Sequence, residues 1–456
     1  MFWTIVNREL IDHIMSFRFF AVFALTILLM SAGVMVFSGN YEKAVREYPR
    51  WVSPLVDENG KTNLFWVPCN GGARIRRAPS PLAFCSGTGD KELPNQAAIA
   101  VHGLAAVERT SEIGEMLYGS IPIDWAFVVS VVLSFAAGLL TYKGISGERR
   151  DGTLTLTLSN PLSKATLLLA KYFAAILALA IAFTAAACFG IITLEVMGKV
   201  QLTGDDWLKI GLFGLASLVY LSIFVLIGLL CSVFTQSPVI SAVAFLFSWA
   251  MLVFVIPNLG GIVTGLVENA KTPYEITKMS ESIRDKYPLN PGISFEREAA
   301  VKLEREKARE DLLIEYVQSL TRQVTLGQDI TRISPASAFS YAAENISGGG
   351  THRLMRFIDN VVRYREGFLT AMIAADKEDT ASQHRYVPWA CGGSNFSHRT
   401  VDLGQAKEFR DVPPSSTEGL KAAFWDLFLL ILYNMVAFAI AFWRFARQDV
   451  APTPGV

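Results

Sequence analysis

Residues 143–164, KGISGERRDGTLTLTLSNPLSK, form a polar and charged segment between two long apolar runs. The segment contains no catalytic triad, no metal-ligand spacing and no glycine-rich phosphate loop. The apolar runs on either side would hold it at a membrane surface, with its charges in water. We therefore expect a mechanical role, in which the segment is offered to another molecule in the cytosol.

The composition is that of a membrane protein. Of 456 residues 52% are hydrophobic, and the mean hydropathy is +0.35. Lys+Arg and Asp+Glu both number 41, so no basic excess indicates a nucleic-acid partner. A membrane-spanning helix needs about 20 apolar residues, and backbone groups in lipid must be satisfied internally. We therefore predict an all-α membrane protein with six transmembrane helices, at residues 17–37, 123–142, 165–194, 207–234, 239–263 and 422–445.

Lys and Arg residues near the ends of the apolar runs predict the orientation, because positively charged loops stay in the cytoplasm. They cluster in the polar segment and next to the first and sixth runs. These places share one side of a six-span chain. We therefore expect the polar segment, both termini and the tail 446–456 in the cytoplasm, and two large inserts, residues 38–122 and 264–420, outside it.

The first sixteen residues are amphipathic. Trp3, Val6, Leu10 and Ile14 recur at helical spacing, with polar residues off that stripe. The pattern favours an interfacial helix over residues 1–16 that contacts membrane lipid. The alternative is that these residues are the first turns of the first span.

The first insert is predicted to be small and mixed. Runs 64–67 and 74–77 are strand-like, and 96–109 is more typical of a helix. Cys69 and Cys85 fall in this insert, and two cysteines in one small extracytoplasmic domain often form a disulfide. Free thiols are the alternative.

The second insert is predicted to be mainly helical. Helices over 295–324 and 351–375 would form an antiparallel, hairpin-like pair joined through 334–350. Each carries a narrow apolar stripe, made of Leu313, Val317, Leu320 and Val324 in one and of Phe357, Val361, Tyr364 and Phe368 in the other. The stripes either bind a partner or pack on the domain's own core.

Other chemistry-bearing residues give weak signals. His384, Cys391 and His398 recur at an interval of seven, which suits ordinary loop residues better than a metal site. Asp426 begins the sixth span, where its carboxylate could reach water, and Asn434 lies within that span, where it could form a hydrogen bond across helices. There is no P-loop and no clustered nucleophile and base, so we expect this chain by itself to be no enzyme and to bind no cofactor.

Two segments resemble a known family. Residues 145–172, ISGERRDGTLTLTLSNPLSKATLLLAKY, resemble the type-2 ABC exporter permeases. The resemblance lies in an acidic–basic pair, a Gly-Thr-Leu run, a Pro turn and a Lys-Tyr pair. The matching residues are Glu148, Arg149, Gly152, Thr153, Leu154, Pro161, Ser163, Lys171 and Tyr172. Residues 334–357, SPASAFSYAAENISGGGTHRLMRF, resemble a subgroup with large outer inserts, which includes permeases of gliding motility and of nitrous-oxide-reductase maturation.

The resemblance implies half of a dimeric permease in the bacterial inner membrane, paired with an identical or a sibling chain. Residues 1–16 would be its elbow helix. The polar segment would dock on a separate ATP-binding subunit, present in two copies, which binds ATP and Mg. The implied coupling residues are Glu148, Arg149, Arg150, Asp151, Gly152, Thr153, Pro161 and Ser163.

Three functions follow from these expectations. The first is the permease subunit of an ABC transporter that exports a substrate across the cytoplasmic membrane. The second is a mechanotransmitter that drives an extracytoplasmic protein partner through its second insert without bulk transport. The third is a membrane-anchored scaffold, in which the polar segment is only a solvated connector.

Overall fold

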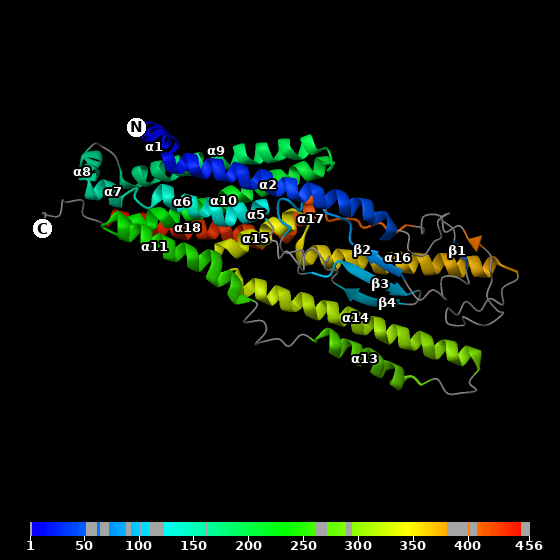
Figure 1. Cartoon of the computed structure of the whole chain (residues 1–456). Coiled ribbons are helices and arrows are strands. Elements are labelled where there is room, and N and C mark those ends of the chain that lie inside the picture. Colours follow the sequence, from blue (N-terminus) through cyan, green and yellow to red (C-terminus); the bar gives the residue numbers. More distant parts are fainter. Residues whose placement is uncertain are drawn as a thin grey trace.

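A computed structural model gives the fold. It describes residues 2–51, 62–63, 73–87, 93–100, 103–108, 123–159, 163–260, 271–288, 294–380, 400–401 and 408–447. The chain is elongated, with a helical bundle at one end and an insert domain of helices and a small sheet at the other (Figure 1). The start of α1, helices α7 and α8 and the end of α18 lie together, at what we call the terminal end of the bundle. The opposite end is the insert end.

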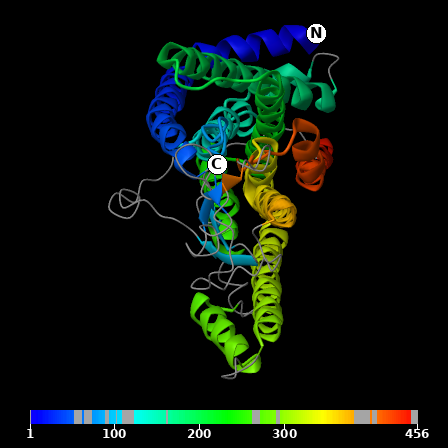
Figure 2. The same cartoon turned by 90° about the vertical axis from the view of Figure 1, so that its right-hand side faces the viewer.

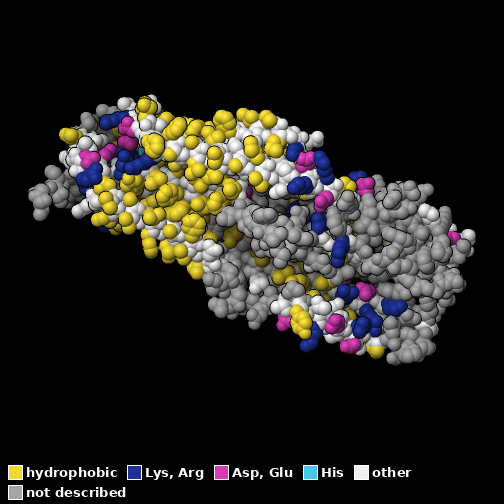
Figure 3. All heavy atoms as spheres, viewed as in Figure 1, with side chains coloured by type: hydrophobic (Ala, Val, Ile, Leu, Met, Phe, Trp, Pro, Cys, Tyr) yellow, Lys and Arg dark blue, Asp and Glu magenta, His cyan; other side chains and the backbone are white. Residues whose placement is uncertain are grey.

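Among the residues that the structure describes, six helices are long and apolar enough to cross a membrane, which confirms the prediction of six spans. Large apolar side chains cover the exposed surface of the bundle (Figure 3). The spans are built from α2 (Phe17–Glu47), α5 (Trp125–Phe127) with η3 (Val128–Leu133) and α6 (Ser134–Thr141), α9 (Lys164–Met197), α10 (Gly204–Phe234), α11 (Pro238–Ala250) with η4 (Met251–Val255), and α18 (Phe424–Ala446). Helix α1 (Phe2–Ile14) precedes them.

Helix α2 continues ten residues beyond the predicted end of the first span. Its extension is polar, and Glu42 forms an ion pair of 2.6 Å with Lys199, which follows α9. The predicted boundary marked where the apolar run stops. A helix can continue past that point because the next proline is Pro49.

Helix α10 lies at the centre of the bundle and packs on α6, α9, α11 and α18. Gly138 of α6 allows α11 to pack closely against α6, because a Cβ at this position would collide with the ring of Phe245 on α11. The predicted bond of Asn434 across helices is confirmed, since its amide donates to the carbonyl of Val219 on α10 at 3.0 Å.

Two spans contain a π-helical turn, η3 and η4. A π turn shifts the backbone hydrogen bonds and can leave carbonyls for other donors. The Tyr220 hydroxyl donates to the carbonyl of Ser130 in η3 at 2.9 Å, and the Ser334 hydroxyl donates to the carbonyl of Leu252 in η4. Both turns are therefore tied to neighbouring helices.

The first insert contributes a three-stranded antiparallel sheet of β2 (Ala73–Arg76), β3 (Gln96–Ala100) and β4 (Gly103–Glu108), in the order β2-β3-β4. The strand expected at 74–77 is confirmed, whereas the helix expected at 96–109 is wrong. Alanine-rich sequence favours a helix by propensity. Here Ala97 and Ile99 instead alternate into a shared core, and that burial decides the structure. The run 64–67 lies outside the described residues. A separate two-stranded antiparallel sheet pairs β1 (Thr62–Asn63) with β5 (Thr400–Val401).

The second insert is mainly helical, as predicted. It contains α13 (Pro273–Lys286), α14 (Phe295–Thr331), α15 (Pro335–Ile346), α16 (Gly350–Glu378) and α17 (Ser416–Ala422). Helices α14 and α16 run in opposite directions, with the sheet of the first insert packed on them (Figure 1). Seen from the insert end, α13 projects to the side opposite α1 and α9 (Figure 2).

The two apolar stripes pack on the insert domain's own core. Leu313 and Val317 of α14 share one buried cluster with Phe357, Val361 and Phe368 of α16. The sheet residues Ile75, Ala97 and Ile99 complete that cluster. The two inserts therefore fold as one domain, and the alternative in which these stripes bind a partner is wrong for their buried part.

Helix α15, expected only as a joint between α14 and α16, enters the insert end of the bundle between α10 and α18. Its Phe339 is fully buried and stacks on Tyr220, with ring centroids 4.6 Å apart. Just before α15, Arg332 forms an ion pair of 2.6 Å with Asp426 of α18. The expectation that Asp426 reaches water is wrong, because its side chain is 0% exposed.

Candidate functional site

The polar segment folds into two short helices at the terminal end, α7 (Ser146–Arg150) and α8 (Thr153–Leu158). Gly152 separates them with a φ of 72°, a left-handed conformation that favours glycine. We call these two helices the terminal element. The backbone N–H groups of Ile145 and Ser146 both donate to the Ser232 hydroxyl at 2.9 Å, which fixes the start of α7 on α10.

A buried lysine joins the terminal element to two other helices. Lys171 of α9 is 4% exposed, and its Nζ donates to Glu148 Oε1 of α7 at 2.6 Å and to Glu9 Oε1 of α1 at 2.7 Å. The two carboxylates are about three-quarters buried. One ammonium thus holds α1, α7 and α9 at a single point.

The electrostatics make this junction rigid. Charge-assisted hydrogen bonds are roughly twice as strong as neutral ones, and water screens this one poorly because it is largely buried. Loss of one partner from a buried ion pair costs about 3–5 kcal/mol, since a charge is left uncompensated. Separating α7 from α1 or α9 would therefore be costly, so the three helices should move together.

A family model for ABC-2 family transporter proteins matches residues 3–450 of this chain. The chain belongs to the ABC-2 family of transporter proteins. No curated protein matches it. The resemblance in the polar segment thus extends to nearly the whole sequence, and the chain is an ABC transporter permease, a multi-pass membrane protein. Family membership implies an ATP-binding partner subunit, and permeases of this family are typically non-catalytic.

The structure brings several of the permease's predicted coupling residues onto the terminal element. Glu148 contacts Lys171, and Arg149 Nη1 donates to the carbonyl of Thr235 at the end of α10, at 3.1 Å. Arg150 and Asp151 form an ion pair of 3.0 Å. Both of these side chains are more than half exposed, so the pair contributes little to stability. Their charges remain accessible to another protein.

The remaining predicted coupling residues shape the turns. The Thr153 hydroxyl donates to the carbonyl of Glu148 at 3.3 Å. The Ser163 hydroxyl accepts a hydrogen bond from the Thr166 N–H at 3.1 Å and so caps the start of α9. Pro161 lies outside the described residues.

Helix α8 offers an apolar side chain to solvent. Helical periodicity places Leu154 and Leu158 on one face and Leu156 on the other. Leu154 is buried, whereas Leu156 is 69% exposed. An exposed leucine between threonines, on the helix that follows the exposed charges of Arg150 and Asp151, suits contact with a partner protein.

Lys171 belongs to the segment that resembles the family, but its contacts cannot be predicted from the sequence. The only signal was a charge within an otherwise apolar span, which usually has a partner inside the protein. Glu9, on the polar side of the N-terminal helix, gave no signal of its own. Their pairing depends on how α1 folds back on α9, and residue spacing does not specify that.

The other predicted site residues stay apart from this junction. His384, Cys391 and His398 lie outside the described residues, and the part of the chain that the structure describes holds no group of three metal ligands. Cys85 is buried, and burial raises the pKa of its thiol well above the usual value. Cys69 lies outside the described residues, so the disulfide remains a prediction.

Proposed function

We propose that this permease couples ATP hydrolysis by a separate ATP-binding subunit to the export of a substrate across the bacterial cytoplasmic membrane. In this proposal the terminal element is cytoplasmic, as are both termini, and it docks on the ATP-binding subunit. Two permease chains, identical or siblings, would pair above two such subunits, which hold the ATP and Mg.

The observation that carries the proposal is the contact of Lys171 with Glu148 and Glu9. A force applied to α7 would reach α9 and α1 through this junction, and α10 through Ser232. The element that would receive the ATP-binding subunit is thus attached to two spans and the N-terminal helix. A solvated connector, as in a scaffold, would not need such attachment.

The docking face can be tested without disturbing the fold. Leu156→Asp places a charge on an exposed face of α8, so folding should be retained. With the purified complex, we expect about ten-fold weaker association with the ATP-binding subunit, the usual loss for a buried interface anchor, and loss of permease-dependent ATPase stimulation. Val412→Asp is the matched control, since Val412 is an exposed apolar residue of the insert domain. Unchanged association of the Leu156→Asp variant would overturn the docking proposal.

The junction at the insert end favours a second candidate, mechanotransmission to an extracytoplasmic protein partner. Arg332 pairs with Asp426, and its carbonyl accepts a hydrogen bond from the Tyr433 hydroxyl, so α18 holds the segment between α14 and α15 at two points. Ser334 adds a bond to η4. Movement of the bundle would therefore reach the insert domain.

A distance measurement separates the two candidates. Spin labels at Tyr274, which is 75% exposed on α13, would report the separation of the insert domains of two paired permease chains. Mechanotransmission predicts a change in this separation between ATP-bound and nucleotide-free states without net substrate movement. Export predicts ATP-dependent substrate movement whether or not the separation changes.

A further inference from the structure

Tyr142 lies where the second span meets the terminal element. It is the C-cap residue of α6, and α7 begins shortly after it at Ser146. The Tyr142 carbonyl accepts hydrogen bonds from the Ser146 hydroxyl at 3.2 Å and from the buried Ser241 hydroxyl of α11 at 2.6 Å. Tyr142 should therefore follow any movement of the terminal element.

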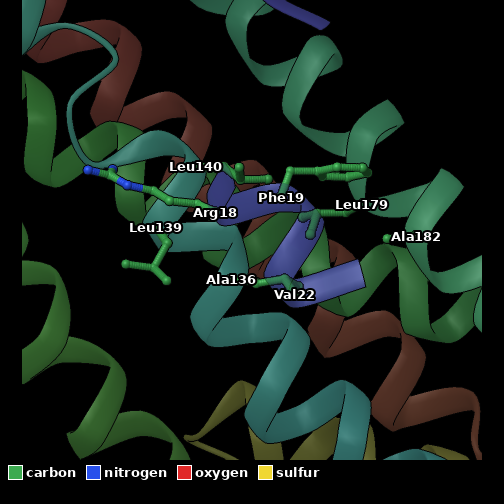
Figure 4. A pocket seen from close by; sticks show the side chains of 8 residues that line it. All are labelled: Arg18, Phe19, Val22, Ala136, Leu139, Leu140, Leu179 and Ala182. Carbon is green, nitrogen blue, oxygen red and sulfur yellow. The ribbon is translucent and has the colours of Figure 1, made fainter. Parts of the chain in front are cut away.

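Arg18, near the start of α2, binds Tyr142. Its Nη1 donates to the Tyr142 hydroxyl at 3.0 Å, and its guanidinium carbon lies 5.6 Å from the centre of the Tyr142 ring. The Arg18 side chain points to the side of Leu139 of α6 and away from Leu179 of α9 (Figure 4). These two contacts clamp the start of α2 to the end of the second span.

Apolar contacts surround this clamp. Phe19 of α2, Leu140 of α6 and Leu179 of α9 are buried around a small hollow between the three helices (Figure 4). Apolar packing allows small sliding movements between helices, whereas a hydrogen bond is directional and favours one position. Arg18 therefore limits the sliding of α2 against α6.

Helix α2 binds the second span again on the other side of the π turn η3. The Trp125 indole N–H, shortly before η3, donates to the Met30 carbonyl of α2 at 3.4 Å. Gly33 lets the two backbones approach, because a Cβ there would lie 2.2 Å from the carbonyl oxygen of Ile123. Since Trp125 precedes η3 and Tyr142 follows it, α2 bridges the π turn.

Helix α2 is also more regular than the span that it bridges. Helices bend at π turns, so a movement that enters the second span at Tyr142 can be absorbed within η3. The 31 residues of α2 form one uninterrupted α-helix, with a length of about 46 Å. It leads into η1 (Tyr48–Trp51), which contacts β2 of the insert domain. A displacement of α2 would therefore reach the insert domain without crossing a π turn.

We propose that Arg18 is a positioning residue for coupling. It clamps α2 to the terminal element, and α2 then acts as a rigid splint that carries the movement of that element past η3 to the insert domain. This inference rests on the proposed function, because α2 has a movement to transmit only if an ATP-binding subunit displaces the terminal element.

The test uses the permease assembled with its ATP-binding subunit in lipid vesicles. Spin labels are placed at two exposed residues, Val45 on the extension of α2 and Leu420 on α17. Unlabelled permease dilutes the labelled chain, so that each distance belongs to one chain. We expect the distance to differ between ATP-bound and nucleotide-free complexes, and Arg18→Gln to remove most of that difference.

Three measurements separate positioning from a merely structural role. Tyr142→Phe removes the hydroxyl acceptor but keeps the ring, so it should reduce the distance change less than Arg18→Gln does. Arg8→Gln removes an exposed charge from α1 and should leave the distance change intact. The unfolding temperature of Arg18→Gln should stay close to that of the unaltered permease, because Arg18 is exposed.

A full distance change in the Arg18→Gln complex would overturn the role of Arg18. The absence of any ATP-dependent change in the unaltered complex would overturn transmission through α2. Arg18→Gln should still associate with the ATP-binding subunit, because it leaves α7 and α8 unchanged. The Leu156→Asp test measures that association alone, so docking can hold even where this inference fails.

Discussion

Lys171 Nζ lies 2.6 Å from Glu148 Oε1, and the lysine side chain is almost fully buried. This ion pair joins the third span to the terminal element, and the second bond of Lys171, to Glu9, adds the N-terminal helix. The permease therefore carries a largely buried charge interaction at the place where, in our proposal, an ATP-binding subunit would dock. The same contact accounts for the lysine in an otherwise apolar span.

Lys171→Met should destabilise the permease, because Glu148 and Glu9 would be left largely buried without a cation. The free energy of unfolding should fall by about 3 kcal/mol. This is the lower end of the range for breaking a buried ion pair, because both carboxylates are partly exposed. Thermal unfolding in detergent checks this. Lys199→Met is the matched control, because the Lys199–Glu42 pair is about one-third exposed and should contribute less than about 1 kcal/mol. Equal losses in the two variants would contradict the prediction.

Asp426→Leu should also be strongly destabilising, since it leaves Arg332 facing a buried apolar group, with the more exposed Asp329 as its carboxylate partner. We expect the free energy of unfolding to fall by about 3 kcal/mol. The double variant Arg332→Met with Asp426→Leu should recover most of this stability, because apolar pairs can replace buried ion pairs. A double-mutant cycle by thermal unfolding measures the coupling. If the two single losses simply add in the double variant, the pair is not the link between α15 and α18 that the structure indicates.

Gly138→Ala should disturb the contact between α6 and α11. The added methyl group would meet the ring of Phe245, and overpacking of this kind costs about 1–3 kcal/mol. Phe245→Leu in the same chain should restore part of the stability by removing the ring. Gly211→Ala on α10 is the control, because a Cβ there meets no atom within 4 Å. Similar unfolding temperatures for the two alanine variants would argue against the close packing.

The contact between α16 and α17 should weaken at acid pH. Hydrogen bonds from the Ser415 backbone, followed by those from Arg356, lower the pKa of Glu418 below its usual 4.5. A carboxyl group whose pKa is lowered on folding stabilises the fold above its unfolded pKa, and loses this effect as the pH falls through the folded pKa. Amide exchange in α17, corrected for its intrinsic pH dependence, should therefore accelerate below about pH 4.5. Glu418→Gln should remove that dependence, and a persisting acceleration would point to another group.

The membrane part of the fold could be predicted because a bilayer imposes long apolar helices, and the six runs were visible as such. The insert domain was less accessible. At Ala97 and Ile99 helical propensity competed with burial against α14 and α16, and a contact so distant in sequence cannot be seen locally. Helix α15 was missed for a related reason, because its alanine-rich sequence is short and becomes buried only between α10 and α18.

The candidate site was predictable as a segment and not as a geometry. The charges of Glu148 and Arg149 and the turn at Gly152 marked the terminal element in the sequence. The contacts of Glu148 depend on Lys171 and Glu9, which are brought to it by the packing of α1 on α9.

The ATPase rate of the assembled complex with Lys171→Gln permease tests the central claim most directly. Glutamine keeps a hydrogen-bond donor but removes the charge that holds Glu148 and Glu9. Assembly is verified by co-purification, so that only folded complexes are compared. The account predicts that the complex still forms and that permease-dependent stimulation of ATP hydrolysis falls to the rate of the ATP-binding subunit alone. Full stimulation by an assembled Lys171→Gln permease would contradict it.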